Sequence, residues 1–135
     1  MNTWLVRIRR TFLLGLAWAA AWAPLGVIVG LIVDADGAMD EPWIAVGAYP
    51  GFLCAIVFAV LVGLTSRQRP FAALSLTRVA VLGALSGLLV IVPVYTAALG
   101  TPNTTHAFYI WRVAIMGVVT LLSTISAVGS AWVAR

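Results

Sequence analysis

Four long apolar runs, residues 11–33, 42–65, 79–99 and 107–134, make up most of this chain of 135 residues. The first three contain no charged side chain, and the fourth contains only Arg112. A helix needs about 20 apolar residues to cross the hydrocarbon core of a bilayer. Because lipid offers no hydrogen-bond partners to the backbone, each run should be helical. The pattern predicts an all-α integral membrane protein, a bundle of four transmembrane helices.

The composition supports lipid as the solvent of this chain. Hydrophobic residues make up 63% of the sequence and charged residues only 9%. A soluble domain carries about a quarter of charged residues, so this chain cannot cover a water-facing surface. Its length fits one membrane domain, residues 1–135, with no room for a second.

The charges predict how the chain crosses the membrane. All four acidic residues lie in the loop 34–41, whereas seven of the eight arginines flank the apolar runs at the opposite ends: Arg7, Arg9, Arg10, Arg67, Arg69, Arg78 and Arg135. The positive-inside rule places both termini and the loop 66–78 in the cytoplasm, and the loops 34–41 and 100–106 outside. Arginines next to the membrane also bind anionic lipid headgroups. In that position they do not indicate a nucleic-acid partner. The lysine-free, Ala/Gly/Arg-rich composition favours a bacterial inner (plasma) membrane.

The first run begins like a secretory signal peptide, with Ala21-Trp22-Ala23 resembling a cleavage site. Pro24 follows directly, which disfavours cleavage, and the run continues to Val33. We therefore expect an uncleaved first span.

Small residues recur at four-residue spacing in several runs. Gly26 and Gly30, Gly47 and Gly51, and Gly83 and Gly87 form literal GxxxG patterns. This spacing places both glycines on one helix face, where a second backbone can approach closely. Two interpretations follow: packing within the bundle, or self-association through a surplus face.

Three runs carry an interior proline, namely Pro24, Pro50 and Pro93. Proline removes a helical hydrogen bond and kinks the helix. Kinks at similar depth would open a vestibule toward the acidic loop. The segment 47–52, with Tyr49, Pro50 and Gly51, is the most favourable place for a locally broken helix, whose freed carbonyls would line a site. The other interpretation is that these prolines are ordinary residues of membrane helices.

Arg112 and the acidic loop form the other candidate site. We expect Arg112 to pair with Asp34, Asp36, Asp40 or Glu41, fastening the fourth span to that loop, or to bind an anionic substrate or headgroup. The opening Asp34-x-Asp36 resembles a calcium loop but lacks the later ligands. Asp40 or Glu41 before Pro42 suits capping of the second span, with the proline as its first helical residue.

Residues for catalysis are absent from the apolar runs. No Ser–His–Asp set, HExxH motif or intramembrane carboxylate pair occurs, so we expect no enzyme, cofactor or metal site. A polar pathway along the fourth run stays an alternative, because the run carries several hydroxyl residues: Thr120, Ser123, Thr124, Ser126 and Ser130. The size and span number are similar to those of the small multidrug resistance transporters, but run 11–33 lacks the glutamate on which that family depends.

Two functions therefore stay open. The first is an accessory or interaction subunit, or a self-associating bundle, in a homo-oligomer or larger membrane complex. The second is a small-solute facilitator or transporter with a vestibule near Pro24, Pro50 and Pro93.

Overall fold

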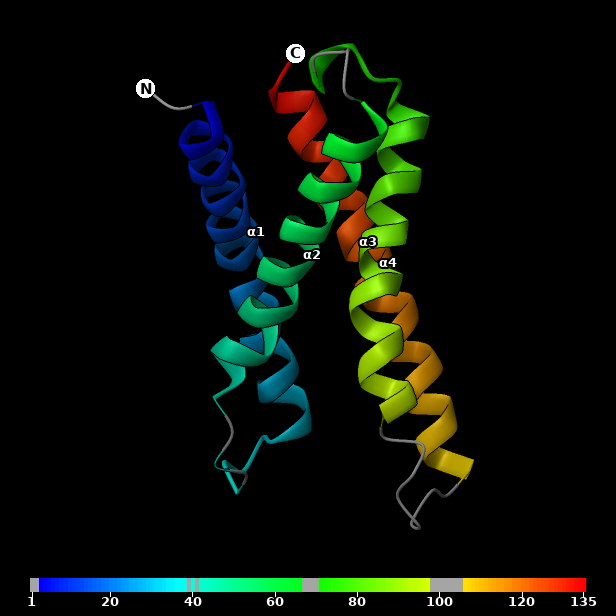
Figure 1. Cartoon of the computed structure of the whole chain (residues 1–135). Helices are drawn as coiled ribbons and strands as arrows, with labels where there is room; N and C mark the ends of the chain where they lie inside the picture. The colour runs from blue at the N-terminus through cyan, green and yellow to red at the C-terminus, as the bar shows by residue number, and fades with distance from the viewer. Residues whose placement is uncertain (1–2, 39, 41, 67–70, 98–105) are drawn as a thin grey trace. The chain divides into compact units, whose positions relative to one another are not determined.

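The computed structural model describes residues 3–38, 40, 42–66, 71–97 and 106–135. The described parts contain the α-helices α1 (Thr3–Val33), α2 (Trp43–Thr65), α3 (Leu76–Ala97) and α4 (His106–Val133), and the short 3-10 helix η1 (Phe71–Ala73) (Figure 1). Each α-helix is long and apolar enough to cross a membrane. The predicted all-α class, with four helices that are each long and apolar enough to span a membrane, is thereby confirmed.

Two helices begin several residues earlier than the apolar runs. α1 starts at Thr3, so Arg7, Arg9 and Arg10 belong to the helix. α3 starts at Leu76 because Ser75 caps it: the Ser75 hydroxyl accepts a hydrogen bond from the backbone N–H of Arg78 at 3.3 Å. This is the usual position of an N-cap side chain, which satisfies one of the first free N–H groups of a helix.

The interpretation of residues 47–52 as a broken helix is wrong, because α2 runs without interruption from Trp43 to Thr65 through Pro50. α1 and α3 likewise continue through Pro24 and Pro93. A proline removes only its own N–H from the helical ladder. Breaking the helix around it would release further backbone groups, which is costly in lipid.

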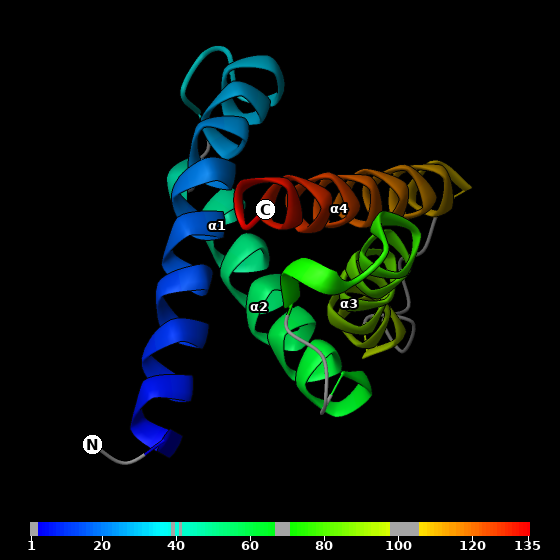
Figure 2. The ribbon, with the colours of Figure 1, turned by 90° about the horizontal axis from the view of Figure 1, so that it is seen from above.

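The chain forms two compact units, residues 1–56 and 57–135, with the division inside α2. The first unit is a helical hairpin of α1 and the first half of α2. The second contains the end of α2, η1 and the α3–α4 hairpin, whose two helices lie side by side in Figures 1 and 2.

In the first hairpin, α1 and α2 pack closely against each other at glycine residues. A methyl group on Gly26 would overlap the carbonyl oxygen of Trp43 and lie 2.6 Å from the backbone nitrogen of Gly47. On Gly51 it would lie 2.9 Å from the Trp22 indole, and Trp22 is buried. Gly30 faces the Trp43 ring in the same way. The interpretation of these glycines as packing positions within the chain is confirmed.

The second hairpin uses small residues and one polar pair. A methyl group on Gly83 would lie 2.6 Å from the Ala127 side chain, and one on Gly87 would lie 2.9 Å from the Thr120 backbone. Between them, the hydroxyls of Ser86 and Ser123 share a hydrogen bond of 2.8 Å, and both side chains are fully buried. The close approach of α3 and α4 thus leaves room for hydroxyls but not for larger side chains.

Two arginines fasten the connection between α2 and α3. Arg78 donates a side-chain hydrogen bond of 2.8 Å to the carbonyl of Thr65, at the end of α2. Arg135 donates one of the same length to the carbonyl of Leu74, after η1. Because the last carbonyls of a helix lack partners within it, Arg78 satisfies a group that lipid cannot.

Candidate functional site

Arg112 lies in α4 at the boundary with α3, and only 6% of its surface is exposed. Its guanidinium carbon lies 5.6 Å from the ring centroid of Tyr95 on α3. This distance fits a cation–π interaction. No sequence pattern connects these two residues, because they lie on different spans. The expected pairing of Arg112 with the acidic loop stays a prediction.

The acidic loop is organised around Asp34. Its carboxylate accepts a hydrogen bond of 3.2 Å from the Trp43 indole N–H, which links the end of α1 to the start of α2. Its carbonyl accepts one of 3.0 Å from the N–H of Gly37. Gly37 has a φ of +66°, which glycine adopts without strain. Asp34 therefore has a structural role in closing this loop.

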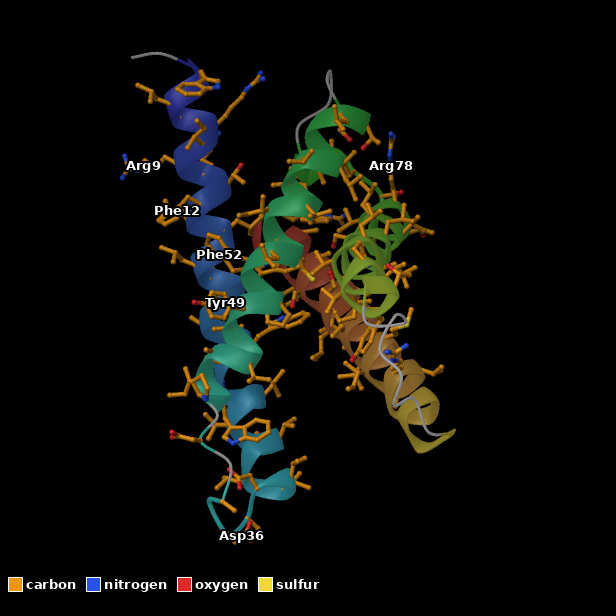
Figure 3. All side chains as sticks on the ribbon, turned by 60° about the horizontal axis from the view of Figure 1, so that its bottom comes forward. Arg9, Phe12, Asp36, Tyr49, Phe52 and Arg78 are labelled. Atoms are coloured by element: carbon orange, nitrogen blue, oxygen red, sulfur yellow. The ribbon has the colours of Figure 1, made fainter. Side chains whose placement is uncertain are left out.

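The other acidic residues differ from Asp34. Asp36 and Asp40 are exposed, and Figure 3 shows Asp36 at the end of the loop. Glu41 lies outside the described residues. Within the described parts of the chain, no group of three His, Cys, Asp or Glu residues is placed to hold a metal ion.

The start of α2 corrects one expectation. The carbonyl of Pro42 accepts hydrogen bonds from the N–H groups of Ala45 at 2.7 Å and Val46 at 3.1 Å, and the helix begins at Trp43. Pro42 is therefore the N-cap residue and not the first helical residue. Proline fits this position because the N–H that it lacks would have no helical partner.

Tyr49, Pro50 and Gly51 do not form one site. Consecutive residues of a helix point about 100° apart. The Tyr49 side chain is 71% exposed, whereas Gly51 is buried against Trp22 and Trp18 of α1. Gly51 is thus a packing residue, and Tyr49 is a surface residue of the hairpin.

The hydroxyls of α4 mostly bond to their own helix. Thr120 donates to the carbonyl of Met116 at 2.7 Å, Thr124 to that of Thr120 at 2.8 Å, and Ser130 to that of Ser126 at 2.8 Å. Ser123 is used in the pair with Ser86. Side chains that bond the preceding turn are common for Ser and Thr in helices. These bonds weaken the case for a polar pathway, because the protons are already engaged.

An apolar groove lies on the α3–α4 hairpin, with a cavity volume of about 450 Å³. It is lined by Leu88, Val113, Met116, Gly117, Thr120, Leu121 and Thr124. Because the threonine hydroxyls donate to the backbone, the groove is almost wholly apolar. At Gly117 an added methyl group would find no atom within 4 Å. We name these seven residues the α4 groove.

Sequence reasoning missed the α4 groove. Gly117 has no small residue four positions away, since Val113 and Leu121 stand there. It therefore has no GxxxG pattern, and its exposure depends on where α3 packs. No protein-family model, curated protein or solved structure matches this chain, so the arguments for its function come from its own residues.

Proposed function

We propose that this chain is an interaction protein of the membrane, an accessory subunit or self-associating bundle that binds another membrane-embedded helix. The observation that carries the proposal is the open position at Gly117 in the α4 groove. The helix faces at the GxxxG glycines are already covered by the neighbouring helix of the same hairpin. Gly117 is exposed and remains available to a helix from outside the hairpin.

The chemistry of the α4 groove supports a helix as its occupant. Helices associate in lipid through van der Waals contact at small residues, where backbones approach closely. Gly117 supplies the small residue, and Val113, Met116 and Leu121 supply apolar walls. The groove offers little to a polar solute. A second copy of this chain is the simplest occupant, and a helix of a larger complex is the other.

The sequence supports a role without catalysis. The four apolar runs hold no carboxylate and a single arginine, whereas intramembrane enzymes and ion pumps depend on ionisable groups within the bilayer. We therefore propose that the chain is not an enzyme.

We also propose the orientation with both termini in the cytoplasm of a bacterium, across its inner membrane. The distribution of arginines supports this proposal. Single cysteines at Asp36 and Ala73, in a Cys54→Ser background, test it with an impermeant thiol reagent on intact cells. We expect labelling at position 36 only. Labelling at position 73 only would reverse the orientation.

Disulfide cross-linking tests the α4 groove. In the Cys54→Ser background we would compare Gly117→Cys with Val118→Cys, which lies at the same depth, is 55% exposed and is outside the groove. Self-association through the groove predicts a covalent dimer for Gly117→Cys and little for Val118→Cys. An accessory subunit predicts no dimer but stoichiometric isolation with a larger complex, which Gly117→Leu abolishes. If neither occurs, the proposal fails.

The facilitator stays the alternative, supported only by the prolines at similar depth. Solute flux in proteoliposomes that depends on Tyr49 or Arg112, and that Gly117→Leu leaves unchanged, would replace the interaction proposal.

A further inference from the structure

α1 is longer than a bilayer requires. Its 31 residues extend about 46 Å at 1.5 Å per residue, whereas the hydrocarbon core is about 30 Å thick. The uncharged part, residues 11–33, already suffices for the core. The first two turns, residues 3–10, are therefore expected to continue as helix into the headgroup region. We name residues 3–10 the basic segment.

The basic segment has an apolar and a basic side. Trp4 and Ile8 lie one turn apart on one side, and they are 66% and 47% exposed. At about 100° per residue, Arg10 lies on the side away from Trp4 and Ile8, whereas Arg7 lies next to Trp4 at the edge of the apolar side. Arg9 also lies away from Trp4, and Figure 3 shows its side chain extending away from α1. The three arginines together occupy the part of the helix circumference that Trp4 and Ile8 leave free.

Among the described arginines that flank the apolar runs, two groups differ by their contacts. Arg78 and Arg135 donate to the carbonyls of Thr65 and Leu74. Arg7, Arg9 and Arg10 are exposed, and none of them has a hydrogen bond or ion pair within the described parts of the chain. Of these five described arginines, the three of the basic segment are available to a ligand from outside.

We propose that the basic segment binds anionic phospholipids through their phosphate groups. Three guanidinium groups on little more than one helical turn create a local positive field, and guanidinium pairs with phosphate in a two-pronged geometry. Trp4 and Ile8 suit the boundary between headgroups and acyl chains. Because each arginine near the surface is attracted to negative charge, the segment prefers anionic over zwitterionic lipid. This inference does not depend on the α4 groove.

A fluorescent probe beside the arginines tests the proposal. In the Cys54→Ser background, Leu5→Cys carries a dye, and the protein is placed in vesicles of phosphatidylcholine with one fifth phosphatidylglycerol. Spin-labelled phosphatidylglycerol or phosphatidylcholine then quenches the dye according to its local concentration. We expect several-fold stronger quenching by the anionic lipid, and loss of that preference in R7Q/R9Q/R10Q.

Two controls separate the basic segment from general charge. R135Q removes an arginine that already has a backbone partner, so the preference should persist. In 1 M salt, where the screening length falls to about 3 Å, the preference of the unaltered arginines should shrink. Equal quenching by both lipids, persistence in R7Q/R9Q/R10Q, or equal loss in R135Q would each overturn the proposal.

Discussion

Replacing Gly26 with alanine tests whether α1 and α2 touch through their backbones. The added methyl group would overlap the Trp43 carbonyl oxygen and lie 2.6 Å from the nitrogen and 2.9 Å from the Cα of Gly47. All three atoms belong to the backbone of α2, so no side chain can rotate to make room. The hairpin has to open locally, which loses contacts on both sides of the new methyl group.

The magnitude follows from two opposing terms. Overpacking by one methyl group costs about 1–3 kcal/mol, and the rigid neighbours place this site in the upper half of that range. Alanine is favoured over glycine within a helix by about 1 kcal/mol. We expect Gly26→Ala to lower the free energy of unfolding by about 1–2 kcal/mol. At Gly117, where nothing lies within 4 Å, only the helical preference remains, so Gly117→Ala should be neutral or stabilising.

Unfolding in mixed micelles by increasing SDS, followed by circular dichroism, measures both variants. Gly15→Ala is an intermediate case, because its methyl group would meet the Phe52 ring at 2.7 Å and a ring can move aside. The expected order of stability is Gly117→Ala, then Gly15→Ala, then Gly26→Ala. If Gly26→Ala unfolds no earlier than Gly117→Ala, the backbone contact is refuted.

Three further predictions concern polar contacts of the second unit. Because Ser86 and Ser123 share one buried hydrogen bond, a double-alanine cycle should give a coupling of about 0.6 kcal/mol; additive effects in the SDS titration would contradict it. Arg135→Gln removes the donor to Leu74 and should cost about 1 kcal/mol, seen as faster hydrogen exchange at residues 71–75; unchanged exchange would argue against the contact. Tyr95→Leu removes the ring beside Arg112 and should cost about 1 kcal/mol, whereas Tyr95→Phe should retain most of the stability; equal losses would exclude a cation–π contribution.

The sequence was sufficient to predict the membrane helices, because apolar length is a local property. The absence of charge from residues 11–33 or 79–99 decides that a helix can lie in lipid, whatever its neighbours are. The GxxxG glycines could also be predicted to be packing positions, because their spacing alone places Gly26 and Gly30 on one helix face. The spacing could not show which helix fills that face.

Contacts between distant residues could not be predicted. In the sequence, Arg78 and Arg135 indicate only the orientation of the spans. Their backbone partners depend on how the chain turns after α2. The proline at position 50 suggested a break, because proline disfavours helices in water. In lipid the cost of exposing more backbone outweighs that preference, and α2 continues. Gly117 carried no motif, so the α4 groove needed the structure.

Counting subunits in nanodiscs extracted directly from cell membranes tests the interaction role most directly. Particles of the unaltered chain, labelled at a single exposed cysteine, should bleach in two or more steps or contain a second, stoichiometric chain. Gly117→Leu should fill the α4 groove, keep the helical spectrum and yield single chains. Single chains without any partner for the unaltered protein, or assemblies that Gly117→Leu leaves intact, would contradict the proposed role of the groove.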